Sequence, residues 1–372
     1  MSAFPDTQAP ATPKFGIWTP YRGKWVLDPR TERLEARFEQ TRDVVLSAER
    51  AGFDTALFAQ HTINPLDAAE EIQEAWTAAA AAAALTERIE IITAIKPKLF
   101  HPVVLAKLAL GIEDISRGRA AINLVNAWFI PELQKAGIGF PEHDARYAYG
   151  AEWIEVVSRL IAGERVTHQG ENFQIDDYVL SPASQWRARP RIYFGGESEP
   201  GRALAVRYAD CWLLNGRPVA DVAPLVADVA RRPRTGAPLT YGITGFSLTR
   251  ETQAEADAAL AELFAIQESF YDTRARDMQK NIDPKVVALK VGSKYPGARM
   301  IGANGGTLPG FVGSYDQVAE RIAAFWDIGI STYLLSFFPL IEEQENFARH
   351  VIPRVRALVA DRPPATRLAA AV

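Results

Sequence analysis

Residues 191–215 have the sequence RIYFGGESEPGRALAVRYADCWLLN. The stretch begins with an apolar run, 191–196, and ends with another, 210–215, each of a length suited to one strand. Between them, the amphipathic segment 200–208 follows a Gly-Gly turn and has the character of a short helix. A strand, a helix and a second strand in this order form a βαβ unit with parallel strands.

The same alternation runs along the rest of the chain. Eight βα units with right-handed crossovers close naturally into a barrel, so we predict an α/β fold of the (β/α)₈ TIM-barrel class. Its active site is expected at the C-terminal ends of the strands. The predicted strands are 14–20, 54–59, 88–94, 119–125, 191–196, 210–215, 239–249 and 331–337. The predicted helices are 33–51, 70–85, 102–116, 146–162, 200–208, 219–231, 252–266 and 314–328.

Two insertions interrupt this repeat. Residues 165–180 alternate around a central glycine, which predicts a β-hairpin. Residues 267–310 are charged and then glycine-rich, which predicts a lid over the barrel mouth, with a disordered surface loop as the alternative. We expect one barrel domain over 14–360, preceded by a disordered lead-in, 1–13, and followed by a flexible tail, 361–372.

Composition excludes several classes of protein. The chain has 372 residues, 48% of them apolar, and a net charge of −4, so it can bury a large core and lacks the basic surface of a nucleic-acid-binding protein. Cys211 is the only cysteine, which excludes a disulfide framework and fits a reducing cytoplasm. The five histidines lack metal-ligand spacing, so no metal is expected. No apolar segment is long enough for a membrane span, and no serine-hydrolase or Walker motif occurs.

The turn after the strand 191–196 is a candidate phosphate site. Gly195 and Gly196 permit close backbone approach, and Ser198 adds a hydroxyl at the start of the following helix. Free N–H groups and the helix dipole favour an anion at this point. The alternative is that a tight βα turn needs glycine whatever it binds.

Polar and aromatic residues gather after the fourth predicted strand. Asn123, Asn126 and Trp128 lie at or just beyond its C-terminal end, where an amide can pair with the donors and acceptors of a heterocycle. His143 and Tyr147 follow at the start of the next long helix. Loop capping is the alternative role of the asparagines.

Together these motifs resemble the luciferase-like flavin-dependent monooxygenases, in particular the alkanesulfonate and dimethylsulfone monooxygenases. The resemblance covers nearly the whole chain, and its segments occur in the order and spacing typical of that family. Four stretches carry it: SRGRAAINLVNAW (116–128), HDARYAYGAEW (143–153), RIYFGGESEPGRALAVRYAD (191–210) and FVGSYDQVAERIAAFWDIGISTYLLSFFPLIEE (311–343).

The resemblance implies a two-component system. A separate NAD(P)H-dependent flavin reductase would supply reduced FMN, which reacts with O₂, while the protein binds, orients and excludes water. It also implies a homo-oligomer, a dimer or a tetramer. By motif position, Gly195, Gly196 and Ser198 would hold the FMN phosphate, His143 and Tyr147 would line its phosphate and ribityl side, and Asn123 would approach the isoalloxazine ring.

The chain departs from the alkanesulfonate monooxygenases in the substrate region. Arg22 stands where those enzymes have a His after the first strand, and their cysteine after the second strand falls near Ile72. The matching positions for their other charged substrate residues carry neutral side chains: Thr244, Phe246, Ala303 and Asn304, with Arg299 a few residues earlier.

Two substrate classes follow from these departures. A sulfonate needs charge-assisted donors, which Arg22, Lys96, Arg217 or Arg299 could supply. A neutral sulfone would instead suit the aromatic residues Trp18, Trp25, Trp128 and Phe246, each of which could equally be core.

Our main hypothesis is FMNH₂-dependent oxidation of a small organosulfur compound, a sulfonate, with C–S cleavage to sulfite and a carbonyl product. Arg22, Trp128 and Arg299 are the predicted catalytic residues, and Arg22, Lys96, Arg217 and Phe246 would bind substrate. The alternatives are a sulfone, a nitrogen heterocycle, an aldehyde or ketone, hydride transfer with a deazaflavin, and a non-catalytic flavin-binding barrel.

Overall fold

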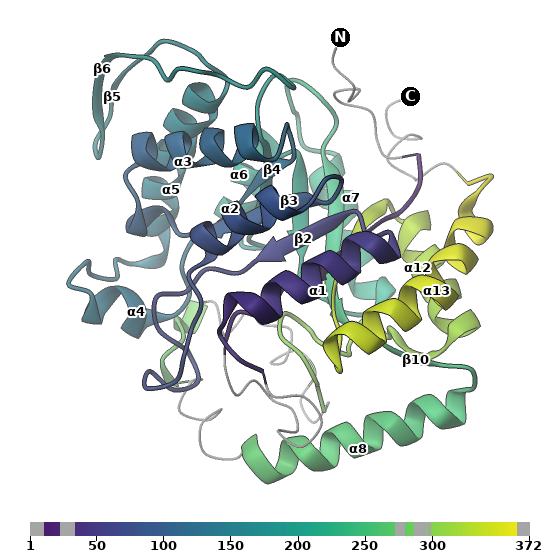
Figure 1. The fold of residues 1–372 in the computed structure, drawn as a ribbon. Coiled ribbons are helices and arrows are strands. Elements are labelled where there is room, and N and C mark those ends of the chain that lie inside the picture. The colour runs from purple at the N-terminus through teal and green to yellow at the C-terminus, as the bar shows by residue number, and fades with distance from the viewer. Residues whose placement is uncertain (1–10, 23–33, 272–279, 286–294, 296–298, 363–372) are drawn as a thin grey trace.

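The computed structural model describes residues 11–22, 34–271, 280–285, 295 and 299–362, and its centre is a closed barrel of parallel strands (Figure 1). The barrel confirms the predicted fold, and each of its strands falls on a predicted one. In order around the barrel, the strands are β1 (Lys14–Trp18), β2 (Thr55–Phe58), β3 (Glu90–Ile95), β4 (Ala120–Val125), β7 (Arg191–Gly195), β8 (Cys211–Leu214), β9 (Thr240–Phe246) and β12 (Ile330–Ser336).

Side chains fill the barrel instead of leaving a channel. One apolar cluster brings together inward-facing residues from neighbouring strands, including Leu57, Ile92, Tyr193, Cys211 and Leu334. A larger cluster on the outer side of the strands packs against the helices. Because both faces of every strand are buried, the strands are continuous apolar runs, as expected for a parallel sheet.

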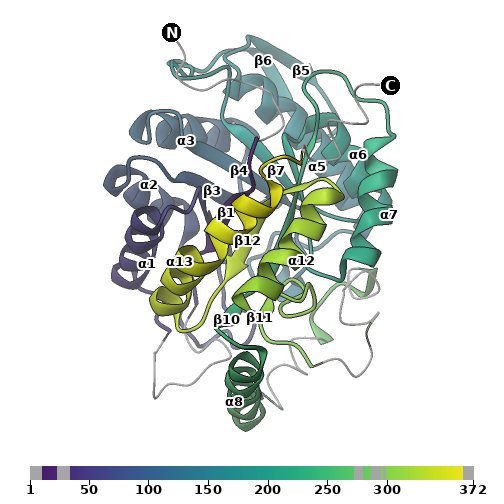
Figure 2. The same ribbon diagram turned by 90° about the vertical axis from the view of Figure 1, so that its right-hand side faces the viewer.

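A ring of helices surrounds the strands (Figure 2). The prediction for this ring was wrong at one place. The predicted helix 252–266 is α8 (Gln253–Tyr271), which belongs to an insertion, and the last helix of the ring is α13 (Leu340–Val359), which was not predicted. Pro353 lies inside α13, as Pro224 lies inside the helix predicted over 219–231. The remaining ring helices are α1 (Phe38–Ala51), α2 (Ala75–Leu85), α3 (Pro102–Ile115), α5 (His143–Ile161), α6 (Glu199–Tyr208), α7 (Val219–Ala230) and α12 (Tyr315–Asp327).

The two predicted insertions lie at opposite ends of the barrel (Figure 1). The hairpin is present as β5 (Val166–Gln169) paired antiparallel with β6 (Gln174–Tyr178). It joins the end of α5 to the start of β7, so it is remote from the C-terminal ends of the strands. At the other end, β10 (Leu248–Arg250) pairs with β11 (Val312–Ser314), and α8 lies beside them.

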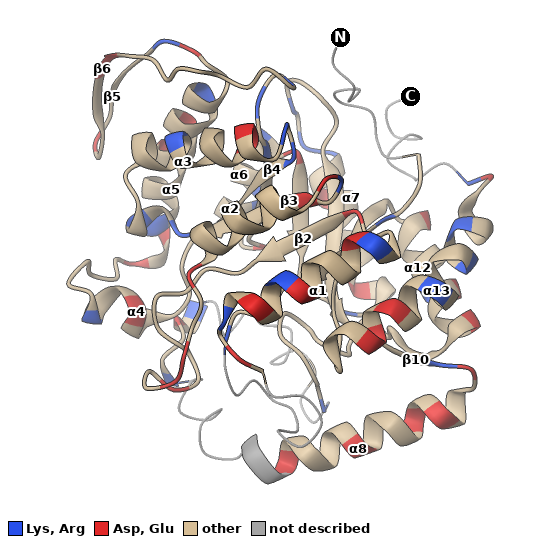
Figure 3. Cartoon of the chain, viewed as in Figure 1, with Lys and Arg blue, Asp and Glu red and all other residues tan. Residues whose placement is uncertain are grey.

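Parts of several predicted regions lie outside the described residues. These parts are 1–10 of the lead-in, 363–372 of the tail, much of the lid segment 267–310, and Trp25. None of the described helices is long and apolar enough to span a membrane. Acidic and basic residues are interspersed along the outer helix α1, whereas in α13 the acidic residues come first and the basic residues follow (Figure 3).

Candidate active site

A cradle forms where β7 meets α6. Ser198 is the N-cap of α6, and its Oγ accepts a hydrogen bond from the Gly201 N–H at 3.3 Å. A Cβ on Gly196 would lie 2.8 Å from the Phe194 ring and 3.0 Å from the Tyr147 hydroxyl, so a larger residue here would displace one of these side chains. The N-terminus of α6, with its partial positive charge, therefore lies next to a glycine turn, whose residues carry no side chain to shield the backbone N–H groups.

The first turn of α5 forms the second wall of this cradle. The centres of the His143 and Tyr147 rings lie 4.7 Å apart, and the Tyr147 hydroxyl lies 3.0 Å from the position that a Cβ on Gly196 would take. Burial raises the pKa of Tyr147, so its hydroxyl stays protonated. His143 Nδ1 lies 2.7 Å from Asp144 Oδ1. His143 Nε2 is buried and has no hydrogen-bond partner within the described part of the chain.

The C-terminal end of β4 completes the cradle. Asn123 Oδ1 lies 3.8 Å from the position that a Cβ on Gly195 would take, so the two neighbouring strands approach closely here. Asn123 Oδ1 and Asn126 Nδ2 are buried without a hydrogen-bond partner among the described residues. Unsatisfied buried polar atoms are costly, and three of them around one cradle indicate a polar ligand.

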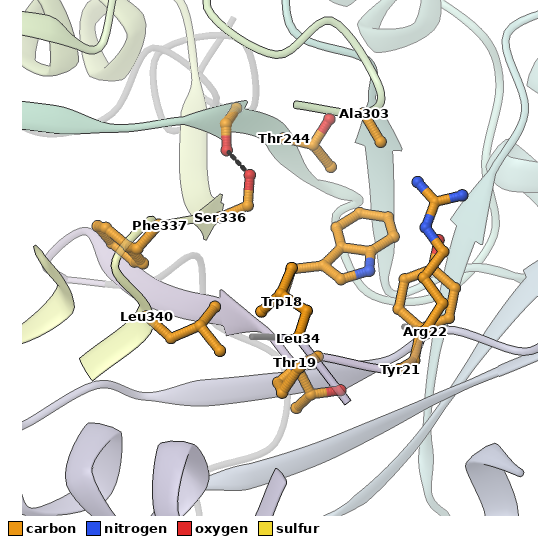
Figure 4. Close-up of a pocket in the computed structure, with 12 residues that line it drawn as sticks. Trp18, Thr19, Tyr21, Arg22, Leu34, Thr244, Ala303, Ser336, Phe337 and Leu340 are labelled. Carbon is orange, nitrogen blue, oxygen red and sulfur yellow. Dashed lines mark hydrogen bonds between the residues drawn. The ribbon is translucent and has the colours of Figure 1, made fainter. Parts of the chain in front are cut away.

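A pocket opens at the C-terminal ends of β1, β9 and β12 (Figure 4). The Trp18 indole lies at its centre, with Tyr21 and Arg22 beside it. The Arg22 guanidinium lies 5.3 Å from the centre of the Tyr21 ring, and Arg22 forms a β-bridge with Ile72. Other lining residues include Thr244, Ala303, Ser336 and Phe337.

A buried polar cluster lies next to this pocket; it consists of His61, Lys96 and Glu132. Lys96 Nζ forms an ion pair with Glu132 Oε2 and lies 2.9 Å from His61 Nδ1. Glu132 comes from α4 (Ile130–Lys135), and its other oxygen accepts a 2.6 Å bond from the Thr62 N–H. His61 packs on both sides: its ring lies 6.2 Å from that of Tyr21 and 5.3 Å, edge to face, from that of Trp128.

The pKa values of the polar cluster follow from burial and pairing. Burial, with a smaller effect of Lys96, lowers the pKa of His61 to about 4. Burial also lowers the pKa of Lys96 to about 8, although Glu132 opposes the shift. Burial opposes ionisation of Glu132 as well, but His61 and Lys96 outweigh it and lower its pKa to about 2. At neutral pH the cluster holds a neutral imidazole beside a Lys–Glu ion pair.

The chain is similar in sequence to known proteins over nearly its full length. The family model described as luciferase-like monooxygenase matches residues 14–332. The chain belongs to this family. An FMNH₂-dependent dimethylsulfone monooxygenase of Pseudomonas putida is 31% identical over 96% of the chain and 99% of its own length. A protein of the same description from Pseudomonas fluorescens (strain Pf0-1) is 30% identical over 93% and 95%.

Solved structures agree on the fold of this luciferase-like monooxygenase. The EDTA monooxygenase EmoA from Chelativorans sp. BNC1 superposes with a TM-score of 0.74 at 18% identity, covering 97% of this chain and 98% of its own. DmoA from Hyphomicrobium sulfonivorans superposes with a TM-score of 0.71 at 16% identity, covering 97% and 95%. At this level of identity, the comparison supports the barrel and says nothing of the substrate.

In this luciferase-like monooxygenase, the residues predicted to bind the flavin lie close together. Gly195, Gly196 and Ser198 lie at the turn, and His143, Tyr147 and Asn123 surround it, in the single cradle described above.

The residues predicted to bind substrate are dispersed. Arg22 lines the pocket, but Lys96 is paired with Glu132 and Arg217 with Glu197 in buried ion pairs. Arg299 pairs with Glu268, and its side chain is 56% exposed. Phe246 is fully buried against Gly302, and Trp128 packs on His61. Of these residues, the structure therefore places only Arg22 in the pocket wall.

The glycine-rich run 302–310 covers the mouth above β8 and β9. The Asn304 carbonyl accepts bonds from the Gly216 N–H at 2.7 Å and from Thr244 Oγ1 at 2.9 Å. The Gly306 carbonyl accepts a 2.8 Å bond from the Phe246 N–H. This packing places Ala303 in the pocket wall, so the end of the insertion forms part of the site.

Two members of the polar cluster were not identified from the sequence. His61 lies two residues after the strand predicted over 54–59, and this position was the available signal because barrel sites gather at strand ends. Glu132 offered no such signal. It lies on a short helix within a connecting segment, and only the fold brings its carboxylate against Lys96.

Proposed function

We propose that this luciferase-like monooxygenase uses reduced FMN and O₂ to oxidise a small organosulfur compound, with a neutral sulfone as the preferred substrate. The observation that carries the proposal is the pairing of a polar cradle, rich in unsatisfied buried groups, with a largely uncharged pocket at the same barrel mouth. The curated relatives described as FMNH₂-dependent dimethylsulfone monooxygenases support it.

The cradle residues fit FMN. Ser198 and the N–H groups at the start of α6 would bind the phosphate, and His143 Nε2 and Tyr147 would contact the same end of the molecule. The amides of Asn123 and Asn126 would pair with the polar edge of the ring. Reduced FMN, delivered by a separate NAD(P)H-dependent reductase, would supply the two electrons that activate O₂.

The charges at the mouth favour a neutral substrate. Lys96 and Arg217 are each bound to a buried carboxylate, so neither offers a free positive charge to an anion. Trp18, Thr244 and Ala303 supply neutral surface instead. A sulfone would be held by packing against these residues and by hydrogen bonds to its two oxygens.

The proposed reaction inserts one oxygen atom of O₂ at the carbon next to sulfur. The other oxygen atom leaves as water with the two electrons of FMNH₂. The C–S bond of the hydroxylated carbon then breaks, which releases an aldehyde and a sulfinate. The hydroxyl proton is released to water as this bond breaks.

A sulfonate is the second candidate, and Arg22 is the observation that favours it. Its guanidinium lines the pocket and could form charge-assisted bonds with a sulfonate group. Oxidative C–S cleavage of a sulfonate would release sulfite in place of a sulfinate.

The test is an assay with FMN, NADH, O₂ and a general flavin reductase, given a panel of dialkyl sulfones and alkyl sulfonates. Aldehyde with sulfinate from the sulfones would support the first proposal, and sulfite from the sulfonates would support the second. If reduced FMN binds but every substrate yields only hydrogen peroxide, the chain is a flavin-binding barrel or acts on another class of compound. The oligomeric state, which we expect to be a dimer or tetramer, is measured by light scattering.

A further inference from the structure

The described part of the insertion includes a short strap, residues 280–285, which lies against the segment after β4. Ile282 and Phe129 form an antiparallel bridge, the Ile130 N–H donates to the Asn281 carbonyl at 3.0 Å, and the Asp283 N–H donates to the Trp128 carbonyl at 3.1 Å. These two hydrogen bonds flank the Ile282–Phe129 pair and form one isolated antiparallel bridge, which joins the strap to the segment that runs into α4.

Asp283 also reaches the flavin cradle. Its carboxylate forms an ion pair with Arg146, and both side chains are buried. Arg146 lies in the first turn of α5, between His143 and Tyr147, and it donates a second bond to the Pro141 carbonyl at 2.6 Å. The ion pair therefore ties the strap to the helix turn that forms one wall of the cradle.

The segment after β4, which the strap contacts, contains a strained residue. Ala127 has a φ of +20°, a strained conformation for a residue with a side chain, and such strain persists only where the surroundings impose it. Ala127 separates Asn126 of the cradle from Trp128, and α4 with Glu132 of the polar cluster follows directly.

We infer that Asp283 is a positioning residue that couples the flavin cradle to the polar cluster. Its carboxylate fixes the first turn of α5 through Arg146, and its backbone fixes the segment that carries Trp128 and Glu132. This inference rests on the proposed FMN site, because it assigns the cradle a ligand.

The first test is Asp283→Asn. Asparagine keeps a side-chain oxygen that can accept the 3.0 Å bond from the Lys285 N–H, so the turn survives while the charge is lost. We expect FMN affinity to fall by about tenfold, as for a lost charge-assisted contact, and a larger share of NADH to be lost as hydrogen peroxide. The matched control is Asp316→Asn, which breaks the exposed Asp316–Arg354 pair and should change neither readout.

A purely structural role predicts a different result: a lower melting temperature with unchanged FMN affinity and peroxide yield in the folded protein. That result would overturn the inference. Failure of the wild-type protein to bind FMN would instead overturn the proposed function.

Hydrogen exchange on the wild-type protein gives a second test that needs no variant. FMN should slow exchange of the Ile130 and Asp283 amides, which lie in the strap contacts, and leave amides of α12 unchanged. Equal exchange at the strap with and without FMN would overturn the coupling, even if Asp283→Asn proved too unstable to purify.

Discussion

Ser198 has two roles that can be separated at the level of a single residue. As an N-cap it stabilises α6, and as a cradle residue it would bind phosphate. We expect Ser198→Ala to weaken FMN binding by about 1 kcal/mol or more, because a donor to a charged group is lost. Fluorescence titration of FMN measures this change.

Ser314 provides the matched control for this experiment. It caps α12 with the same 3.3 Å geometry, accepting from the Gln317 N–H, and lies away from the cradle. Loss of an N-cap should lower the free energy of unfolding by about 1 kcal/mol in both Ser314→Ala and Ser198→Ala. Ser314→Ala should leave FMN affinity unchanged. Equal FMN affinities in the two variants would remove Ser198 from the phosphate site.

His61 predicts the pH dependence of stability. Its pKa is lowered to about 4 in the folded protein by burial, while in the unfolded chain it stays near 6.5. Between these values the unfolded state binds more protons, so stability falls as pH decreases, by up to about 1.4 kcal/mol per pH unit. The free energy of unfolding, measured with urea at several pH values from 7 to 4, should therefore change less steeply with pH for His61→Gln than for the wild type. Parallel curves would show that the folded protein accommodates a protonated His61.

At the scale of elements, the glycine-rich run 302–310 shows how a loop becomes part of a site. Gly305 has a φ of +97°, and a Cβ there would lie 2.0 Å from the Gly216 carbonyl oxygen. We expect Gly305→Ala to displace the run from the end of β8, and with it Ala303 in the pocket wall. Substrate KM should rise, and the melting temperature should fall.

Gly236→Ala is the control for Gly305→Ala, because it introduces backbone strain without a steric clash. Its φ of +93° is similar, but no atom lies within 4 Å of its hypothetical Cβ. Gly236→Ala should cost only the backbone strain, about 1 kcal/mol, with no change in KM. If both variants raise KM alike, the packing of the 302–310 run on β8 does not shape the pocket.

At the scale of the whole molecule, the cradle and the pocket lie on different strands. The cradle uses β4, β7 and α5, whereas the pocket uses β1, β9 and β12. We therefore expect Arg22→Gln to change substrate turnover while leaving FMN affinity nearly intact. Turnover of a sulfonate should collapse and that of a sulfone should change little. Equal loss of FMN affinity and of turnover would place Arg22 in the flavin site or in the fold itself.

The barrel could be predicted from the sequence because its signals are local. Each strand is an apolar run, and each βα connection contains its own turn and cap signals, so the eight strands were identified without knowledge of their partners. One part of the cradle is equally local, because Gly195, Gly196 and Ser198 lie within four residues of the chain. The resemblance to the family added His143, Tyr147 and Asn123. The ring helix α13 was missed although its buried residues recur at helical spacing, so its local pattern was available in the sequence.

Only the tertiary structure decided which charges are available to a substrate. Lys96, Arg217 and Arg299 were equivalent candidates in the sequence, yet the fold gives each a carboxylate partner from a segment that local pattern does not connect to it. Arg146 and Asp283 likewise meet across 137 residues of chain. Strand and helix signals act over a few residues, whereas the pairing of a buried charge depends on which distant segments the barrel closure brings together.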